Sequence, residues 1–171
     1  MRDLQSGMVF LRKARNMFKT IITNIESLKM NLIPYRIIKQ IKDDEGFRSK
    51  AYECPAGKLT IGYGRNIESN GITEQEAEHL LMNDIKGAQR ELRSSFPWFT
   101  MLSTARQGAL INMCFNIGLT RMLDFKKMIA ALEVGDYKEA ANQMLDSKWA
   151  RQVGDRATRL ADEMRGQNAD Y

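Results

Sequence analysis

Three side chains that can do chemistry lie between positions 45 and 60: a carboxyl, a thiol and a hydroxyl. Eight residues separate Glu45 from Cys54, and five separate Cys54 from Thr60. Glu45 closes an acidic run just before Gly46, where the negative end of a helix dipole and the neighbouring carboxylates disfavour ionisation. A carboxyl group that keeps its proton can serve as a general acid. Acidic runs are mostly exposed to solvent and do not by themselves indicate a site. The functional interpretation therefore rests on the spacing from Glu45 to Cys54 and Thr60.

The residue types in the chain exclude several other kinds of site. His79 is the single histidine, so His-based triads and multi-histidine metal centres are excluded. Cys54 and Cys114 are the two cysteines, and their spacing matches no zinc site. We expect Cys114 to pack in a core, between Met113 and Phe115, and His79 to be solvated. Chemistry therefore has to rest on carboxylates, hydroxyls or a thiol.

A short helix is predicted to end at the carboxyl group of Glu45. Pro34 fits the first turn of this helix, and Gly46 fits a left-handed stop just after it. Three isoleucines on one side of the segment are expected to form its buried face: Ile37, Ile38 and Ile41.

A small antiparallel hairpin is predicted to carry the thiol and the hydroxyl. It covers residues 51–64 and turns at residues 54–57, which contain proline and glycine. Gly62 and Gly64 would allow a backbone or a ligand to come close. A third short strand is expected before the turn signal Asn70-Gly71.

The rest of the chain is predicted to be helical. Thr73 and Glu76 form a capping box that opens a long helix running through Leu92, expected to connect two lobes. Apolar periodicity then predicts helices at 104–117, 124–133, 137–145 and 155–165, with a break at Gly118.

The predicted fold is α+β and predominantly helical, with two lobes. We expect a small lobe at residues 34–72, a connecting helix at 73–93 and a helical lobe at 94–171, preceded by an extension at 1–33. A cleft between lobes is the default place for a binding site. No apolar run approaches the roughly 18 residues that a membrane-spanning helix needs.

The positive charge of the chain is concentrated in residues 1–33. Six basic residues against two acidic ones give this segment +4 of the total +5. Its apolar positions alternate by three and four, which is typical of an amphipathic helix that packs on the fold or on a second copy. Alternatively, residues 8–32 contact an anionic membrane or lipopolysaccharide. A signal peptide fits less well, because Lys19 and Thr20 interrupt the apolar stretch. The nearly neutral remainder disfavours nucleic acid as a partner.

The motif Glu45-x8-Cys54-x5-Thr60 resembles that of the phage-type lysozymes, or endolysins, in which Glu is followed by Asp or Cys and then Thr. The resemblance extends over about residues 34–171. It also rests on the blocks Asp44-Glu45-Gly46, Thr60-Ile61-Gly62-Tyr63-Gly64, Asn112 to Gly118, and Ser147-Lys148-Trp149 followed by Asp155-Arg156-Ala157.

The resemblance implies hydrolysis of the β-1,4 bond between N-acetylmuramic acid and N-acetylglucosamine in bacterial peptidoglycan. By this resemblance Glu45 is the proton donor, Thr60 positions water, and Cys54 stands where many relatives have Asp. Three more residues match substrate-binding positions: Arg65, where close relatives carry His, Asn116, and Arg156, near the catalytic Glu.

The family relation also carries expectations about cofactors, partners and location. No metal or organic cofactor is expected, and the enzyme is expected to be a monomer. It would accumulate in the host cytoplasm until a holin opens the way to the cell wall, since no signal peptide is evident.

Cys54 is the main departure from the family pattern. A thiol is mostly protonated at pH 7 unless its surroundings lower its pKa, and it can act as a base or as a nucleophile. Glu53 is a weaker candidate for the base, because neighbouring strand residues point to opposite faces. A lytic transglycosylase, which needs one acid/base group and forms 1,6-anhydro ends, is the alternative enzyme. A membrane-active protein acting through residues 8–32 is the alternative from another class.

Overall fold

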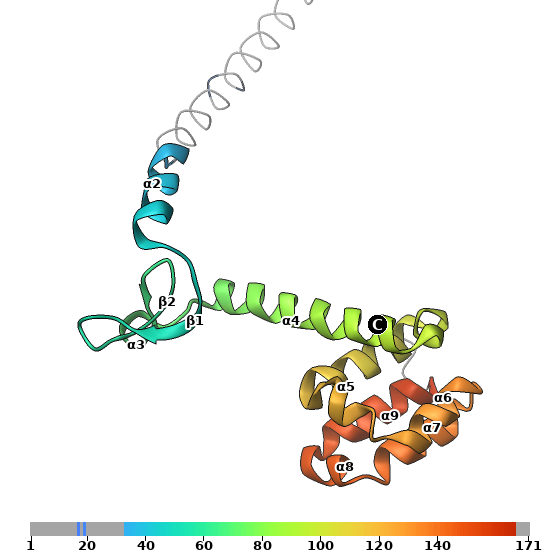
Figure 1. Ribbon diagram of the computed structural model, residues 1–171. Coiled ribbons are helices and arrows are strands. Elements are labelled where there is room, and N and C mark those ends of the chain that lie inside the picture. Colours follow the sequence, from blue (N-terminus) through green and yellow to red (C-terminus); the bar gives the residue numbers. More distant parts are fainter. Residues whose placement is uncertain (1–16, 18, 20–32, 167–171) are drawn as a thin grey trace, which may run out of the picture. The chain divides into compact units, whose positions relative to one another are not determined.

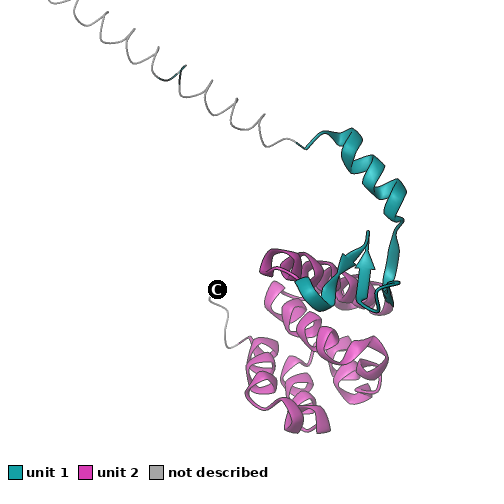
Figure 2. Cartoon of the chain, turned by 90° about the vertical axis from the view of Figure 1, so that its left-hand side faces the viewer, with its two compact units in different colours: residues 1–71 teal, residues 72–171 magenta. Residues whose placement is uncertain are grey.

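The computed structural model describes residues 17, 19 and 33–166 (Figure 1). The amphipathic helix expected at residues 8–32 therefore lies almost entirely outside the described residues. The chain forms two compact units, residues 1–71 and residues 72–171 (Figure 2).

The first unit begins with helix α2, Tyr35–Glu45, which follows Pro34. The helix ends as predicted at Gly46, whose φ is +65° and whose N–H donates to the Lys42 carbonyl oxygen at 3.1 Å. The buried face predicted for α2 is wrong, because its three isoleucines are exposed. The strands of this unit pack with one another and meet α2 at its C-terminal end, so none of the described strands covers the isoleucine side of the helix.

A three-stranded antiparallel sheet follows in the order β1-β2-β3, which confirms the predicted hairpin and third short strand. Its strands are β1 Arg48–Glu53, β2 Leu59–Gly62 and β3 Arg65–Asn66, with Tyr52 opposite Thr60. The one-turn helix α3, Ile67–Asn70, closes the unit and is capped by the Asn66 side chain.

The β1-β2 connection is a tight loop, fixed by two backbone hydrogen bonds and by the conformations of Pro55 and Gly57. Cys54 O accepts from Gly57 N at 2.8 Å, and Cys54 N donates to Lys58 O at 3.0 Å. Gly57 has a φ of +72°, the left-handed conformation that a three-residue hairpin loop needs at its last position. Pro55 supplies the fixed φ that favours the start of the turn. The predicted turn at 54–57 is confirmed.

The second unit is helical throughout. It starts with α4, Glu74–Ser95, whose predicted capping box is confirmed: Glu76 N donates to Thr73 Oγ1 at 3.2 Å, and Thr73 N donates to Glu76 Oε2 at 2.7 Å. The following elements are η1 Pro97–Met101, α5 Thr104–Met122, α6 Lys126–Glu133, α7 Tyr137–Leu145, α8 Lys148–Val153 and α9 Asp155–Arg165. Gly118 interrupts α5 with a φ of +76°, as expected from the sequence.

Helices α5 to α9 gather around one apolar core, to which α4 adds its C-terminal half (Figure 1). Cys114 is buried there, as predicted. Methionine is prominent in the core, and its flexible side chain fills irregular spaces between short helices. The largest fully buried side chains are Leu92, Phe99, Leu110, Met113, Met122, Met128, Met144 and Met164.

The Arg106 side chain helps to tie the C-terminal helix to the rest of this unit. Arg106 of α5 donates from Nε to the Met164 carbonyl oxygen at 2.9 Å, and its guanidinium lies 3.7 Å from the ring centroid of Tyr137.

The observed fold is α+β and predominantly helical, as predicted. Among the described helices, none combines the length and the apolar character that crossing a bilayer would require.

Candidate functional site

Glu45 is the last residue of α2, and its carboxyl group lies against the turn between β2 and β3. A Cβ atom added to Gly64 would stand 2.7 Å from Glu45 Oε2. Gly64 also has a φ of +76°, which favours glycine for a second reason. The close approach that the sequence suggested for Gly64 is therefore an approach of the Glu45 carboxyl group.

Cys54 stands at the mouth of the hairpin loop, where the residue is half-buried. The backbone N–H of Lys58, then that of Ala56, and then the Thr60 hydroxyl hydrogen-bond to the sulfur. These donors lower the pKa of the Cys54 thiol from its ordinary value, against a smaller opposing effect of burial. The thiolate is therefore favoured by the same tight loop that gives the hairpin its shape.

Thr60 is the third member of the predicted triad and is 3% exposed. Its hydroxyl donates to the Lys58 carbonyl oxygen at 3.0 Å and also contacts the Cys54 sulfur. A hydroxyl group has one proton, so it donates to one of these two acceptors at a time. A negative sulfur is the stronger acceptor, so the direction of the Thr60 hydroxyl depends on the protonation state of Cys54.

Glu68 supports the loop from α3, and sequence reasoning missed it. Lys58 Nζ lies 2.8 Å from Glu68 Oε1, and Leu59 N donates to Glu68 Oε2 at 3.3 Å. The hydrogen bond from Lys58, followed by that from Leu59, lowers the pKa of the Glu68 carboxyl group. No local pattern marks this residue, because its partners come from the neighbouring strand.

Two other residues of the first unit have clear positions. Arg65, predicted to bind substrate, is half-buried on β3 and donates from Nε to the Gly71 carbonyl oxygen at 3.0 Å. This bond ties β3 to the end of α3. Glu53 is exposed, and a Cβ on Gly57 would lie 3.8 Å from its Oε1, so its carboxylate lies beside the hairpin loop.

In the second unit, Asn116 holds a tryptophan in place. Asn116 Oδ1 accepts from the indole nitrogen of Trp149 at 2.8 Å. Trp149 packs edge to face on Phe125, with ring centroids 6.4 Å apart. Trp149 and Phe125 both line a pocket of about 710 Å³. The predicted substrate residue Asn116 therefore orients a wall of this pocket.

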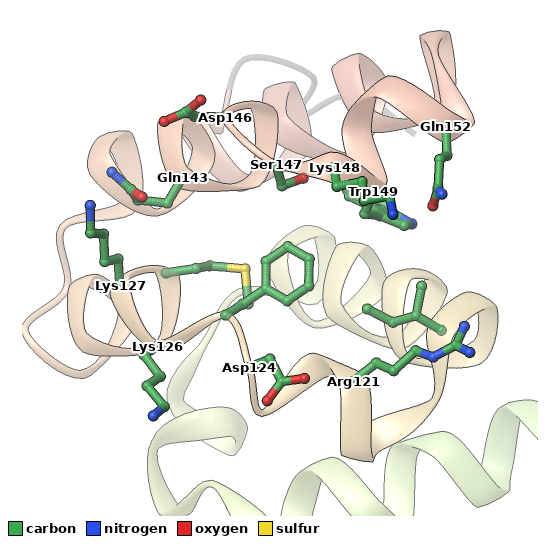
Figure 3. A pocket seen from close by; sticks show the side chains of 13 residues that line it. Arg121, Asp124, Lys126, Lys127, Gln143, Asp146, Ser147, Lys148, Trp149 and Gln152 are labelled. Atoms are coloured by element: carbon green, nitrogen blue, oxygen red, sulfur yellow. The ribbon is translucent and has the colours of Figure 1, made fainter.

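The pocket is built from residues of α5 to α8 and from the connections between α5 and α6 and between α7 and α8 (Figure 3). Trp149 lies on one wall of the pocket, and Arg121 and Asp124 lie on the opposite wall. The lining carries more basic than acidic groups: Arg121, Lys126, Lys127 and Lys148 against Asp124 and Asp146. Its members are spread over more than thirty positions without a motif, so sequence reasoning did not find it.

Arg156, also predicted to bind substrate, lies in the first turn of α9 and is engaged with α5. Its Nη2 donates to Asn112 Oδ1 at 2.6 Å and to the Asn112 carbonyl oxygen at 3.2 Å, and its Nε donates to Asn112 Oδ1 at 2.9 Å. The structure thus brings Cys54 and Thr60 together, joins Asn116 to Trp149, and joins Arg156 to Asn112.

Comparison with known proteins identifies the family. A family model described as phage lysozyme matches residues 42–165. An endolysin of Acyrthosiphon pisum secondary endosymbiont phage 1 is 34% identical over 114 residues, which cover 65% of this chain and 75% of that protein. The pre-baseplate central spike protein Gp5 of Enterobacteria phage T4 is 30% identical over 150 residues, covering 71% of this chain and 26% of that protein. Probable T4-type lysozyme 1 of Dictyostelium discoideum is 29% identical over 157 residues, covering 72% of this chain and 92% of that protein. The chain belongs to the phage lysozyme family.

Proposed function

We propose that this protein is a muramidase that hydrolyses the β-1,4 bond between N-acetylmuramic acid and N-acetylglucosamine in peptidoglycan. The observation that carries the proposal is the hairpin loop, in which Cys54 N donates to Lys58 O and Cys54 O accepts from Gly57 N, so that the Lys58 and Ala56 N–H groups and the Thr60 hydroxyl lower the pKa of the Cys54 thiol. A sulfur held in this way can replace the carboxylate that many relatives have at its position. Glu45, placed by α2 against Gly64, supplies the acid.

The reaction needs one proton donor and one group that accepts a proton or stabilises positive charge. Glu45 donates its proton to the glycosidic oxygen as the bond from that oxygen to the anomeric carbon breaks. A water molecule adds to the anomeric carbon, and the proton that it loses passes to the Cys54 thiolate. Exchange with solvent then returns the proton to Glu45.

Thr60 acts through Cys54 in this proposal. The family resemblance implies that this threonine positions water, but a side chain that is 3% exposed has little surface to offer a water molecule. Its hydroxyl instead contacts the sulfur. We propose that Thr60 stabilises the thiolate by turning its proton from the Lys58 carbonyl oxygen toward Cys54.

We further propose that the Trp149 pocket contacts the substrate. Its basic rim fits the carboxylates on the peptide stems of a glycan strand, while Trp149, which is 5% exposed, supports the pocket from the core. Asn116 takes part by fixing the indole of Trp149. Arg65 and Arg156 are proposed to support the sites of their own units, through Gly71 and Asn112.

In the cell, we propose that the enzyme is an endolysin that attacks the wall from inside at the end of infection. The similarity to an endolysin that is covered over 75% of its length supports this role. The similarity to a baseplate spike protein raises the alternative of a particle-bound lysozyme. Immunodetection in purified phage particles, against its presence in the lysate alone, separates the two roles.

The test of the activity is a pair of substitutions assayed on purified peptidoglycan. Glu45→Gln keeps the size of the side chain but removes the transferable proton, so clearing should fall by about 100-fold or more. The matched control is Glu53→Gln, which changes a nearby exposed carboxylate and should retain clearing.

Clearing by the Glu45→Gln protein at the parent rate would reject the assignment of the proton donor. Mass spectrometry of the products then distinguishes the two enzyme classes. Free reducing ends support hydrolysis. 1,6-Anhydro ends would show a lytic transglycosylase, which a site without a second carboxylate also permits.

A further inference from the structure

Two large aromatic side chains remain exposed at the point where α2 meets the turn between β2 and β3. Phe47, just after the helix, is 66% exposed, and Tyr63, in the turn, is 43% exposed. Their ring centroids lie 5.4 Å apart with the planes tilted by 47°. They therefore form one continuous apolar patch, called the aromatic pair below.

The aromatic pair lies beside the proposed proton donor. Glu45 stands two residues before Phe47, and its carboxyl group lies over Gly64, the residue that follows Tyr63. Lys42, one helical turn before Glu45, places Nζ 5.3 Å from the centroid of the Tyr63 ring. The pair is thus fixed from two elements, and the Tyr63 ring has a cation over one face.

Another aromatic residue of the same unit is more covered than the aromatic pair. Tyr52 on β1 is half-buried, and the Arg48 guanidinium lies 4.2 Å from its ring centroid. Phe47 has no polar atom in its side chain and yet keeps about two thirds of its surface in water. An exposed apolar patch next to a reacting group is a typical feature of a ligand-binding surface.

A pyranose ring has the chemistry that fits this patch. Its axial C–H groups form a weakly positive face, which packs against the negative face of an aromatic ring, while its hydroxyl groups remain at the edge. We infer that Phe47 and Tyr63 form a stacking surface for a sugar of the glycan strand, next to the bond that Glu45 protonates. This inference rests on the proposed muramidase function and adds two specificity-determining residues to it.

The test measures glycan binding without turnover. All proteins carry Glu45→Gln, and each is titrated calorimetrically with a soluble tetrasaccharide of alternating N-acetylglucosamine and N-acetylmuramic acid. Adding Tyr63→Leu or Phe47→Leu should weaken binding by about fivefold, since an aromatic contact contributes on the order of 1 kcal/mol beyond the buried area. Tyr63→Phe keeps the ring and should change the affinity by less than about twofold.

The matched control is Tyr35→Leu, which removes an aromatic ring that is 79% exposed at the opposite end of α2. It should leave the affinity unchanged. Equal affinities for the Tyr63→Leu protein and its Glu45→Gln parent would overturn the stacking surface. So would an equal loss in the Tyr35→Leu protein, because the effect would then not depend on the aromatic pair.

The parent chain with Glu45 intact separates this inference from the proposed function. If the parent chain cleaves peptidoglycan while Tyr63→Leu binds the tetrasaccharide normally, the stacking surface is refuted and the muramidase proposal stands. If the parent chain cleaves no glycan, the muramidase proposal fails, and the stacking surface fails with it. Because both rings are exposed, thermal unfolding of the variants should match that of the parent.

Discussion

The two units of the chain are stabilised by different kinds of interaction. In the described part of the first unit, Thr60 is the one buried residue, and the sheet, the loop and the helix end are held mainly by hydrogen bonds and aromatic contacts. The second unit buries an apolar core contributed by α4, η1 and every helix from α5 to α9. The residues proposed to act in catalysis lie in the first unit, and most of the buried apolar side chains lie in the second. Activity and stability should therefore respond to different substitutions.

The largest effect on stability is expected from the core of the second unit. Leu110 is fully buried, so Leu110→Ala should lower the free energy of unfolding by about 2–5 kcal/mol through lost contacts and a residual cavity. The matched control is Leu80→Ala on α4, where the side chain is exposed and the change should stay within about 0.5 kcal/mol. Urea unfolding measures both. Equal losses would contradict the assignment of the core.

A smaller effect, on activity, is expected from the turn of the first unit. Gly64→Ala places a methyl group 2.7 Å from Glu45 Oε2 and strains a residue with a φ of +76°. Gly62→Ala imposes similar backbone strain, at a φ of +68°, with no atom within 4 Å of the new methyl group. We expect Gly64→Ala to lose about tenfold more activity than Gly62→Ala, because a misplacement of a catalytic group on the order of 1 Å is costly. Similar losses in the two proteins would show that the position of Glu45 does not depend on Gly64.

The smallest effect on stability is expected from the hydrogen bond between Asn116 and the buried Trp149 in the second unit. Asn116→Leu removes the acceptor of the Trp149 indole N–H and should cost about 1 kcal/mol of unfolding free energy. Asn116→Asp keeps an acceptor oxygen and should restore most of that loss. Urea unfolding followed by tryptophan fluorescence measures the difference, and equal stability of the Leu and Asp variants would argue against the bond.

Much of the fold could be predicted because local signals agree with the tertiary structure. The capping box at Thr73, the break at Gly118 and the bounds of α7 and α9 follow from residue types at fixed offsets. Helix α8 was not predicted, since six residues are too few to show a period. The isoleucines of α2 were expected to be buried, but periodicity shows only that a helix has an apolar side and not what covers it.

Only the side chains of the candidate site, and not the groups around them, could be predicted from the sequence. The spacing of Glu45, Cys54 and Thr60 could be found by counting along the chain. The donors around the sulfur could not, because they are backbone N–H groups of a loop whose geometry depends on Gly57. Glu68 and the Trp149 pocket also depend on contacts between segments that are distant in the sequence.

The role of the sulfur is tested most directly by the pH dependence of peptidoglycan cleavage in the parent and in Cys54→Asp. An ordinary thiol has a pKa of about 8.5 and an ordinary aspartate carboxyl group one of about 3.9. The loop donors lower the pKa of the Cys54 thiol from its ordinary value. If the thiolate is the working form, activity is present above its pKa and is lost as the pH falls through it. The parent should therefore lose activity on acidification at a higher pH than Cys54→Asp does. Coincident acid limbs in the two proteins would contradict it.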